Sequence, residues 1–204
     1  MTALRRWGFP AFALFMLVLP ALPVPDFWIT QSNYIGLYAM VALGLVLLTG
    51  VSGLTSFGQA AFVGIGAYTA AYLATQAGLP PWLTLPVGLL LAVLAGLLGG
   101  LITPRMSGHY LPLATIAWAL VLYYSMGNME ALGKYDGILG IPTIKAFGVD
   151  LGTGRGLHPL IWALALVAAL AVTHLLDSRP GRAIRSLKSG STMAQAMGIS
   201  TFRY

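Results

Sequence analysis

Residues 82–102 read WLTLPVGLLLAVLAGLLGGLI, a run without a charged side chain. A helix over this run is about 30 Å long, which matches the thickness of the hydrocarbon core of a bilayer. Similar apolar runs recur along the chain and predict six transmembrane helices in all, over residues 9–24, 34–48, 60–77, 82–102, 110–126 and 158–176. We therefore expect an all-α fold, a polytopic transmembrane helical bundle that forms a single domain over residues 1–204.

The composition also indicates lipid as the natural solvent. Of the 204 residues, 58% are hydrophobic and only 8% are charged, against about 25% charged in soluble proteins. There is no cysteine, and the three histidines, His109, His158 and His174, lack the spacing of metal ligands. We expect no metal site and no cofactor. The net charge of +6 follows the membrane pattern described next, so we expect no nucleic-acid partner.

The basic residues predict the orientation. With six spans and a cytoplasmic N-terminus, eight basic residues lie inside and three outside, as the positive-inside rule requires. The inner set is Arg5, Arg6, Arg105, Arg179, Arg182, Arg185, Lys188 and Arg203, and the outer set is Lys134, Lys145 and Arg155. Both chain ends are then cytoplasmic, residues 125–157 form a glycine-rich external loop, and residues 177–204 form a cytoplasmic loop.

The first apolar run has a second interpretation. Arg5 and Arg6 before it would also suit a secretory signal peptide. No clean cleavage site follows the run, and five later spans are predicted. We therefore expect an uncleaved first helix.

The stretch over residues 48–69, LTGVSGLTSFGQAAFVGIGAYT, is rich in glycine and small hydroxyl residues. It predicts either an ordinary turn or a helix broken at membrane depth beside a solute path, because irregular backbone survives in a membrane only when it is buried in protein or lines a wet cavity. The residues of the predicted broken helix are Gly53, Thr55, Ser56, Gly58 and Gln59.

Small residues at helical spacing predict packing faces. Ser56, Ala60 and Gly64 recur every fourth residue, and Gly96 with Gly100 forms a GxxxG motif. Gly88 extends no such row, so we expect Gly64→Leu to impair assembly or transport more than Gly88→Leu.

The C-terminal segment predicts a short helix after a basic one. Gly190 separates the two, Thr192 and Gln195 have the spacing of a capping box, and Gly198 closes the second helix. Met193 and Met197 share one face of it, which suits docking into a groove of a partner. Alternatively, the preceding basic helix, with Arg182, Arg185 and Lys188, attracts anionic lipid.

Four segments resemble the permease subunits of branched-chain amino acid ABC transporters, nearest to the LivM branch of that family. They are GQAAFVGIGAYT at 58–69, RMSGHYLPLAT at 105–115, DGILGIP at 136–142, and the segment from GRAIR at 181–185 to AQAMGI at 194–199. The segments occur in the order found in the family and cover nearly all of the chain.

The resemblance implies a permease of the inner (plasma) membrane with three kinds of partner: ATP-binding ABC subunits, a second homologous permease subunit, and a periplasmic or external solute-binding protein. It also implies that the cytoplasmic loop contacts the ATPase through Gly181, Arg182, Arg185, Thr192, Ala194, Gln195, Met197 and Gly198. We therefore expect Ala194→Arg or Gly198→Trp to abolish ATP-driven uptake while solute binding persists.

The sequence departs from the family in two ways. Members often carry acidic residues after the basic helix, where this chain has Ser189, Ser191 and Gln195. The family also continues into further spans, so we expect a truncated protein or a fragment.

The leading functional hypothesis is a permease for branched-chain or related amino acids. The chain has no phosphate-binding loop, so the ATPase would be a separate subunit, and we expect no enzyme activity in this chain. An energy-independent channel or a secondary transporter for small polar solutes such as urea or amides is the alternative. An intramembrane enzyme would need a serine beside a histidine or paired carboxylates, and the sequence shows no such pairing.

Overall fold

The computed structural model describes residues 3–102, 110–146, 149–188, 190–196 and 198. Its helices, in chain order, are α1 (Ala3–Val18), α2 (Asp26–Leu45), α3 (Gln59–Thr75), α4 (Pro81–Ile102), α5 (Tyr110–Asn128), α6 (Gly154–Asp177), α7 (Arg179–Leu187) and α8 (Ser191–Ala196). A π-helical turn, η2 (Val46–Val51), extends α2. One 3-10 turn, η1 (Leu19–Ala21), follows α1, and two, η4 (Glu130–Leu132) and η5 (Lys134–Asp136), follow α5. The described strands, β1 (Lys145–Ala146) and β2 (Val149–Asp150), form one small antiparallel hairpin. The all-α fold class is therefore confirmed.

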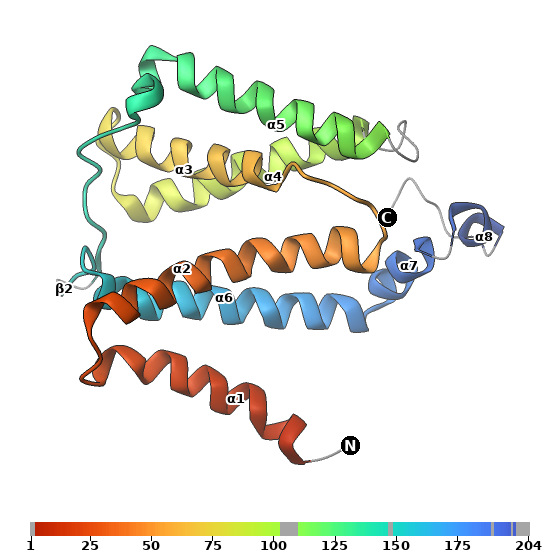
Figure 1. Cartoon of the computed structure of the whole chain (residues 1–204), viewed down its shortest axis with the longest axis horizontal. Helices are drawn as coiled ribbons and strands as arrows, with labels where there is room; N and C mark the ends of the chain where they lie inside the picture. Colours follow the sequence, from red (N-terminus) through yellow and green to blue (C-terminus); the bar gives the residue numbers. More distant parts are fainter. Residues whose placement is uncertain (1–2, 103–109, 147–148, 189, 197, 199–204) are drawn as a thin grey trace.

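The long helices form two groups. In Figure 1, α1, α2 and α6 lie together below, and α3, α4 and α5 lie together above. The most extensive contacts join α2 to α6 and α3 to α4, whereas α2 and α3 touch only slightly. The groups are connected by residues 52–58 at one end and by the chain after α5 at the other.

Four described helices are long and apolar enough to cross a membrane: Asp26–Val51, Pro81–Leu101, Tyr110–Asn128 and Gly154–Asp177. The first and third predicted spans are helical but shorter. The apolar stretch of the first is Trp7–Ala21, and α3, which forms the third, has 17 residues. The third is short because the backbone before it, over residues 52–58, is not helical.

Two predicted boundaries were wrong for a shared reason. The second span begins at Asp26 rather than at residue 34, and the sixth begins at Gly154 rather than at residue 158. Polar residues at both starts lowered the apparent hydropathy. In the fold, these residues lie inside the helices, where the side chains of Ser32, Asn33 and His158 are buried.

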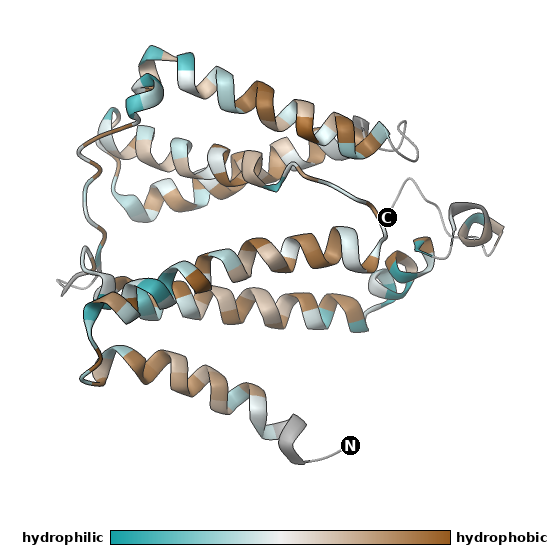
Figure 2. Ribbon diagram, viewed as in Figure 1, coloured by the Kyte–Doolittle hydropathy of each residue, from teal (hydrophilic) through white to brown (hydrophobic). Residues whose placement is uncertain are grey.

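The outer surface of the bundle is apolar. Figure 2 shows hydrophobic residues along the middle of the helices and hydrophilic ones at their ends and over α7. Leu89, Leu97 and Leu98 of α4 are each more than 60% exposed. In water such a surface would be very unfavourable, and in a bilayer it contacts lipid or another subunit.

Candidate functional site

Of the five residues predicted to form a broken helix, the four up to Gly58 are not helical, and Gln59 begins α3. Beyond η2, the chain runs through residues 52–58 without regular structure until α3 begins at Gln59. Gly53 adopts a left-handed conformation, with φ of 78°, which favours glycine. The amide of Ser52 donates to the carbonyl of Leu47 at 3.1 Å, and that of Leu54 donates to Leu48 at 3.0 Å. These bonds turn the chain back from the end of α2.

The returning segment lies against α5. The amide of Phe57 donates to Thr115 Oγ1 at 3.1 Å, and a Cβ on Gly58 would lie 3.5 Å from the carbonyl oxygen of Thr115. Thr115 is in the second turn of α5, about 7.5 Å along the axis from its first residue, Tyr110. The non-helical backbone therefore lies level with the body of α5, and in Figure 1 it runs from the end of α2 toward the α3–α4–α5 group.

The five residues of the predicted broken helix differ in exposure. Ser56 and Gly58 are buried, Gln59 is half-buried, and Gly53 and Thr55 are exposed. Ser56 Oγ accepts a bond from the Gly58 amide at 3.3 Å, so it supports the turn into α3. Gln59 Oε1 lies 3.7 Å from where a Cβ on Gly44 of α2 would be. The segment therefore brings polar groups to the junction of α2, α3 and α5, and their role in transport stays a prediction.

The predicted packing residues occupy different environments. Gly64 faces Met126 Sδ of α5, which would lie 3.5 Å from an added Cβ, and Gly96 faces Phe62 of α3 at 3.8 Å. Among the residues that the structure describes, an added Cβ on Gly100 would meet no atom within 4 Å, and Ala60 is exposed. Ala60 and Gly100 therefore have room for a neighbour beyond this chain, and their packing role also stays a prediction.

Gly88 extends no row of small residues in the sequence, but it lies at a close helix contact. A Cβ on Gly88 would lie 2.9 Å from the backbone oxygen of Gly66, so the backbones of α3 and α4 approach closely there. The sequence suggested Gly64 because it continued a row of small residues. The contact instead pairs two glycines on neighbouring helices, and a one-helix periodicity does not show such a pairing.

The start of the predicted coupling loop is held by a helix cap and by close backbone packing. Ser178 caps α7 by accepting from the Gly181 amide at 3.3 Å. Gly181 is buried against the backbone of Leu175 and Leu176, leaving no space for a side chain. Arg182 Nη1 donates to the carbonyl of Asp177 at 3.1 Å, and Arg185 is exposed.

The short helix α8 corrects part of the prediction. It begins at Ser191, so Thr192 lies inside its first turn and is not its capping residue, as Gly190 accepts the first bond from the Ala194 amide at 3.1 Å. Gly198 ends the helix as expected, with φ of 78° and its amide bonded to Gln195. Met197 lies outside the described residues.

Exposure separates the side chains of α8. Ala194 is only 1% exposed, so it is buried within this chain, whereas Met193 is 61% exposed. Gln195 is exposed as well. Ala194→Arg would therefore disturb the fold of the loop before it affected a partner, and Met193 is the described side chain of α8 that is best placed for docking.

A buried polar cluster between α2 and α6 was not predicted. Ser32 Oγ lies 3.1 Å from His158 Nε2 and accepts from Trp162 Nε1 at the same distance. Next to it, Asn33 Nδ2 donates to the carbonyl of Gly154 at 2.7 Å. Ser32 and His158 resemble a nucleophile and base, but both are buried, and His158 Nδ1 has no hydrogen-bond partner. The geometry therefore suits helix adhesion, and the polar run at residues 31–33 was the overlooked signal.

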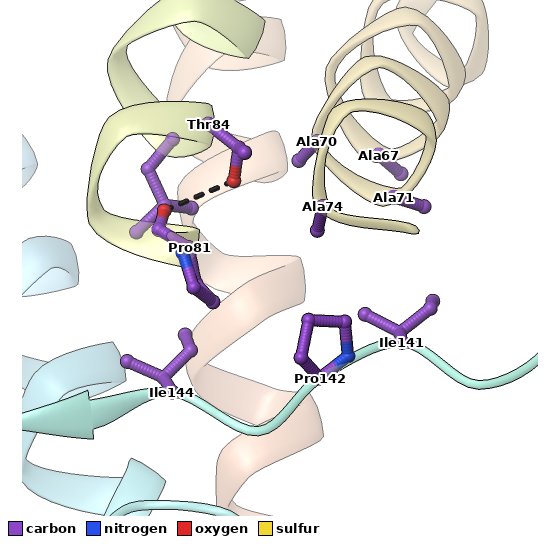
Figure 3. Close-up of a pocket in the computed structure, with 10 residues that line it drawn as sticks. Ala67, Ala70, Ala71, Ala74, Pro81, Thr84, Ile141, Pro142 and Ile144 are labelled. Carbon is purple, nitrogen blue, oxygen red and sulfur yellow. Dashed lines mark hydrogen bonds between the residues drawn. The ribbon is translucent and has the colours of Figure 1, made fainter. Parts of the chain in front are cut away.

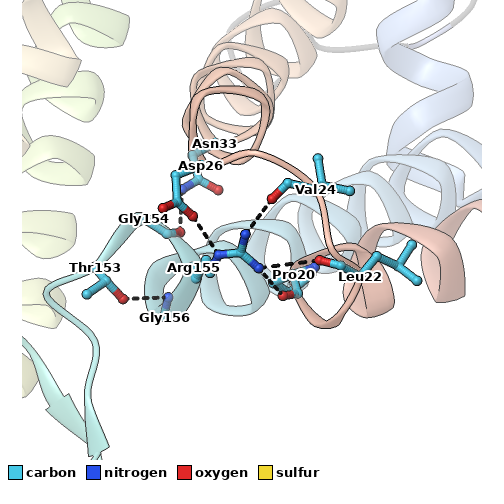
Figure 4. A network of polar contacts seen from close by, with 9 residues as sticks. All are labelled: Pro20, Leu22, Val24, Asp26, Asn33, Thr153, Gly154, Arg155 and Gly156. Carbon is cyan, nitrogen blue, oxygen red and sulfur yellow. Dashed lines mark hydrogen bonds and ion pairs between the residues drawn. The ribbon is translucent and has the colours of Figure 1, made fainter.

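Arg155 is a second contact that was not predicted. From the first turn of α6, its Nε donates to Asp26 Oδ1 at 2.6 Å, and its Nη atoms donate to backbone carbonyls of Pro20, Leu22 and Val24 (Figure 4). Asp26 is mostly exposed, so the carbonyls of the α1–α2 connection make the more protected contacts. Arg155 thereby fixes the ends of α1, α2 and α6 to one another.

The loop after α5 closes over the ends of α3 and α4. A small cavity of about 160 Å³ is lined by Ala67, Ala71 and Ala74 of α3 and by Thr84 of α4. Figure 3 shows these residues around it. Ile141, Pro142 and Ile144 of the loop complete it, and Trp82 Nε1 secures the loop by donating to the carbonyl of Lys145 at 2.7 Å. The Thr84 hydroxyl is already bonded to Pro81, so the cavity is essentially apolar.

The sequence was compared with known proteins. The family described as branched-chain amino acid transport system / permease component matches residues 28–204. The chain is 29% identical over 191 residues to the high-affinity branched-chain amino acid transport system permease protein LivM of Escherichia coli, covering 82% of this chain and 45% of that protein. The Salmonella typhimurium LivM protein gives the same identity and coverage.

A more distant relative is the probable branched-chain amino acid transport permease protein LivH of Methanocaldococcus jannaschii. It is 28% identical over 180 residues, covering 81% of this chain and 55% of that protein. The chain therefore spans about half the length of the curated relatives it matches. No solved structure matches it.

The family match covers α2 from residue 28 onward and all the described helices after it, together with the broken helix and the α7–α8 loop. With four helices capable of crossing a membrane, the chain is a multi-pass protein of the inner membrane. Its relatives are permease components of transporters rather than enzymes. The chain belongs to the family of branched-chain amino acid transport system permease components.

Proposed function

We propose that the chain is part of a permease subunit of an ABC importer, which moves branched-chain or related amino acids inward using ATP hydrolysed on a separate subunit. The single observation that carries this proposal is the family match over residues 28–204, which includes the irregular segment between α2 and α3. The names of the relatives favour this function over a channel or secondary transporter for urea or amides.

The proposed topology has six spans and cytoplasmic ends. The six long helices alternate in direction, so the N-terminus, the end of α2 and α7 lie at one end of the bundle (Figure 1). The chain after α5, with Lys134 and Lys145, lies at the other end. We expect single cysteines at positions 136 and 188 to react with impermeant reagents from opposite sides. Reaction of both from the same side would refute this topology.

The proposed solute path passes the broken helix at Gly53, Thr55, Ser56, Gly58 and Gln59. Irregular backbone at the level of a spanning helix needs either burial in protein or a wet cavity. Thr55 is exposed, and no side chain caps the N-terminus of α3, where Gly58 is the capping residue. Uncapped helix N-termini carry partial positive charge, so they suit the carboxylate of an amino acid.

The proposed partners are ATP-binding ABC subunits, a second homologous permease subunit and a periplasmic or external solute-binding protein, with lipid around them. The ATPase contact is proposed for the α7–α8 loop, through Gly181, Arg182, Arg185, Thr192, Ala194, Gln195, Met197 and Gly198. Because Ala194 is buried, Met193→Glu is a cleaner test of docking than Ala194→Arg. We expect Met193→Glu to weaken ATPase binding while the protein still inserts into membranes.

The function is tested with the complete transporter in proteoliposomes. We expect uptake of leucine, isoleucine or valine that requires the solute-binding protein and ATP, with urea and simple amides transported much more slowly. Solute movement down its gradient without ATP at an equal rate would support the channel instead.

A further inference from the structure

One lysine joins the α7 helix to the broken helix. Lys188, directly after α7, donates from Nζ to the carbonyl of Gly50 at 2.9 Å, across 138 positions of the chain. Its aliphatic stem lies over Gly53, where an added Cβ would be 3.4 Å from Lys188 Cγ. The ammonium and the aliphatic stem of Lys188 therefore both contact the segment of residues 50–53, where the helical backbone that begins as α2 ends.

The contact has a clear physical basis. The last carbonyls of a helix lack partners within the helix, and a cation is favoured beside them. At the end of η2, backbone amides satisfy the carbonyls of Leu47 and Leu48, and the Lys188 ammonium satisfies that of Gly50. Hydrogen bonds from charged donors are stronger than neutral ones. Lys188 therefore caps the irregular end of α2.

The cap lies between two well-anchored parts. Behind it, α7 is held to the end of α6 by the Ser178 cap and by the burial of Gly181. Ahead of it, residues 52–58 reach α5 through Phe57 and Thr115. Since α2 and α3 touch only slightly, Lys188 is one of the described links through which a movement of α7 reaches the second helix group.

We infer that Lys188 is a positioning residue for transport: its bond to Gly50 makes the conformation of residues 50–58 depend on the position of α7. This inference rests on the proposed function, in which the ATPase acts on the α7–α8 loop and solute passes the broken helix. A loop movement that keeps the cap pulls the segment along, and one that breaks the cap releases it. Ligand binding can shift such an equilibrium only through a contact that differs between states.

The test compares three variants of the full-length subunit in the complete transporter. Lys188→Met keeps the stem and removes the ammonium, Lys188→Arg keeps a donor, and Arg179→Met removes a charge from an exposed residue of α7 that is not among the proposed ATPase-contact residues. We expect Lys188→Met to assemble normally but to lower the solute imported per ATP hydrolysed about tenfold, which corresponds to about 1.4 kcal/mol. We expect Lys188→Arg to recover most of this ratio and Arg179→Met to leave it unchanged.

A second measurement is independent of transport. Hydrogen exchange of the amides in residues 52–58 should become about tenfold faster in Lys188→Met and stay unchanged in Arg179→Met. Equal exchange in both variants would overturn the cap itself. Faster exchange with an unchanged import ratio would overturn its coupling role. If the unmodified transporter imports no solute with ATP, the proposed function fails, and the exchange result still decides whether the cap exists.

Discussion

The helix pairs α2–α6 and α3–α4 are held together in different ways. Between α2 and α6, Ser32, Asn33, His158 and Trp162 form buried hydrogen bonds, and Arg155 fixes one end. Between α3 and α4, two glycine backbones meet at Gly66 and Gly88. In lipid, apolar burial gives little drive for helices to associate, so adhesion depends on hydrogen bonds or on close van der Waals packing. The α2–α6 pair therefore depends on hydrogen bonds, and the α3–α4 pair depends on close packing.

The comparison predicts the largest effect at Gly88. Gly88→Leu places a branched side chain where even a Cβ would come within 2.9 Å of the Gly66 oxygen, and the backbone there cannot rotate away. We expect a loss of about 3 kcal/mol in the free energy of unfolding, measured in mixed micelles. The matched control is Gly100→Leu in the same helix, where an added Cβ meets no atom within 4 Å.

Gly64→Leu should destabilise less than Gly88→Leu, because its nearest neighbour is the flexible end of Met126. Equal losses at Gly64, Gly88 and Gly100 would show that the α3–α4 pair does not depend on the close approach at Gly66.

An intermediate effect is expected at Arg155. Arg155→Ala removes the bonds to Asp26 and to the carbonyls of the α1–α2 connection. Because the arginine side chain is 40% exposed, solvent weakens its ion pair, and we expect a loss of about 1 to 2 kcal/mol. Asp26→Asn should lose less, since the carbonyl contacts remain. A larger loss in Asp26→Asn would mean that the ion pair, rather than the carbonyls, holds this end together.

The smallest effect is expected at Ser32. Ser32→Ala removes the shared partner of His158 and Trp162, and side-chain hydrogen bonds between membrane helices contribute about 0.6 kcal/mol on average, with a maximum of about 1.7. We expect a loss of about 1 kcal/mol, against no measurable change for Ser125→Ala, whose side chain is exposed. A double-mutant cycle that combines Ser32→Ala with Trp162→Phe should show that the two losses in the free energy of unfolding are not additive. Additive losses would place the two side chains in separate interactions.

The same comparison explains what could be predicted from the sequence. The apolar runs predicted all six long helices, because an uncharged apolar run as long as residues 82–102 is typical of a helix in a bilayer. The glycines at 53, 190 and 198 predicted interruptions or ends of helices, and each adopts positive φ in the structure. These features depend on a residue and its near neighbours in the sequence.

Contacts between distant segments were not predictable in this way. Ser32 finds His158, Gly66 finds Gly88, and Lys188 finds Gly50 only when the helices are assembled. In the sequence-based prediction, Ser32 lay outside the second span and His158 lay at the first position of the sixth, and Ala194 was expected to contact a partner although it is buried. A helical period reports which face is apolar, and it does not report which partner covers that face.

The proposed solute path at the broken helix can be measured most directly by cysteine accessibility. The chain contains no cysteine, so single cysteines can be introduced at Thr55 and, as a lipid-facing control, at Leu97. In the complete transporter, we expect Thr55→Cys to react with a water-soluble thiol reagent and to be protected when leucine and the solute-binding protein are present, while Leu97→Cys does not react. Failure of Thr55→Cys to react in any transport state, or reaction that transported solute never changes, would contradict a solute path at this segment.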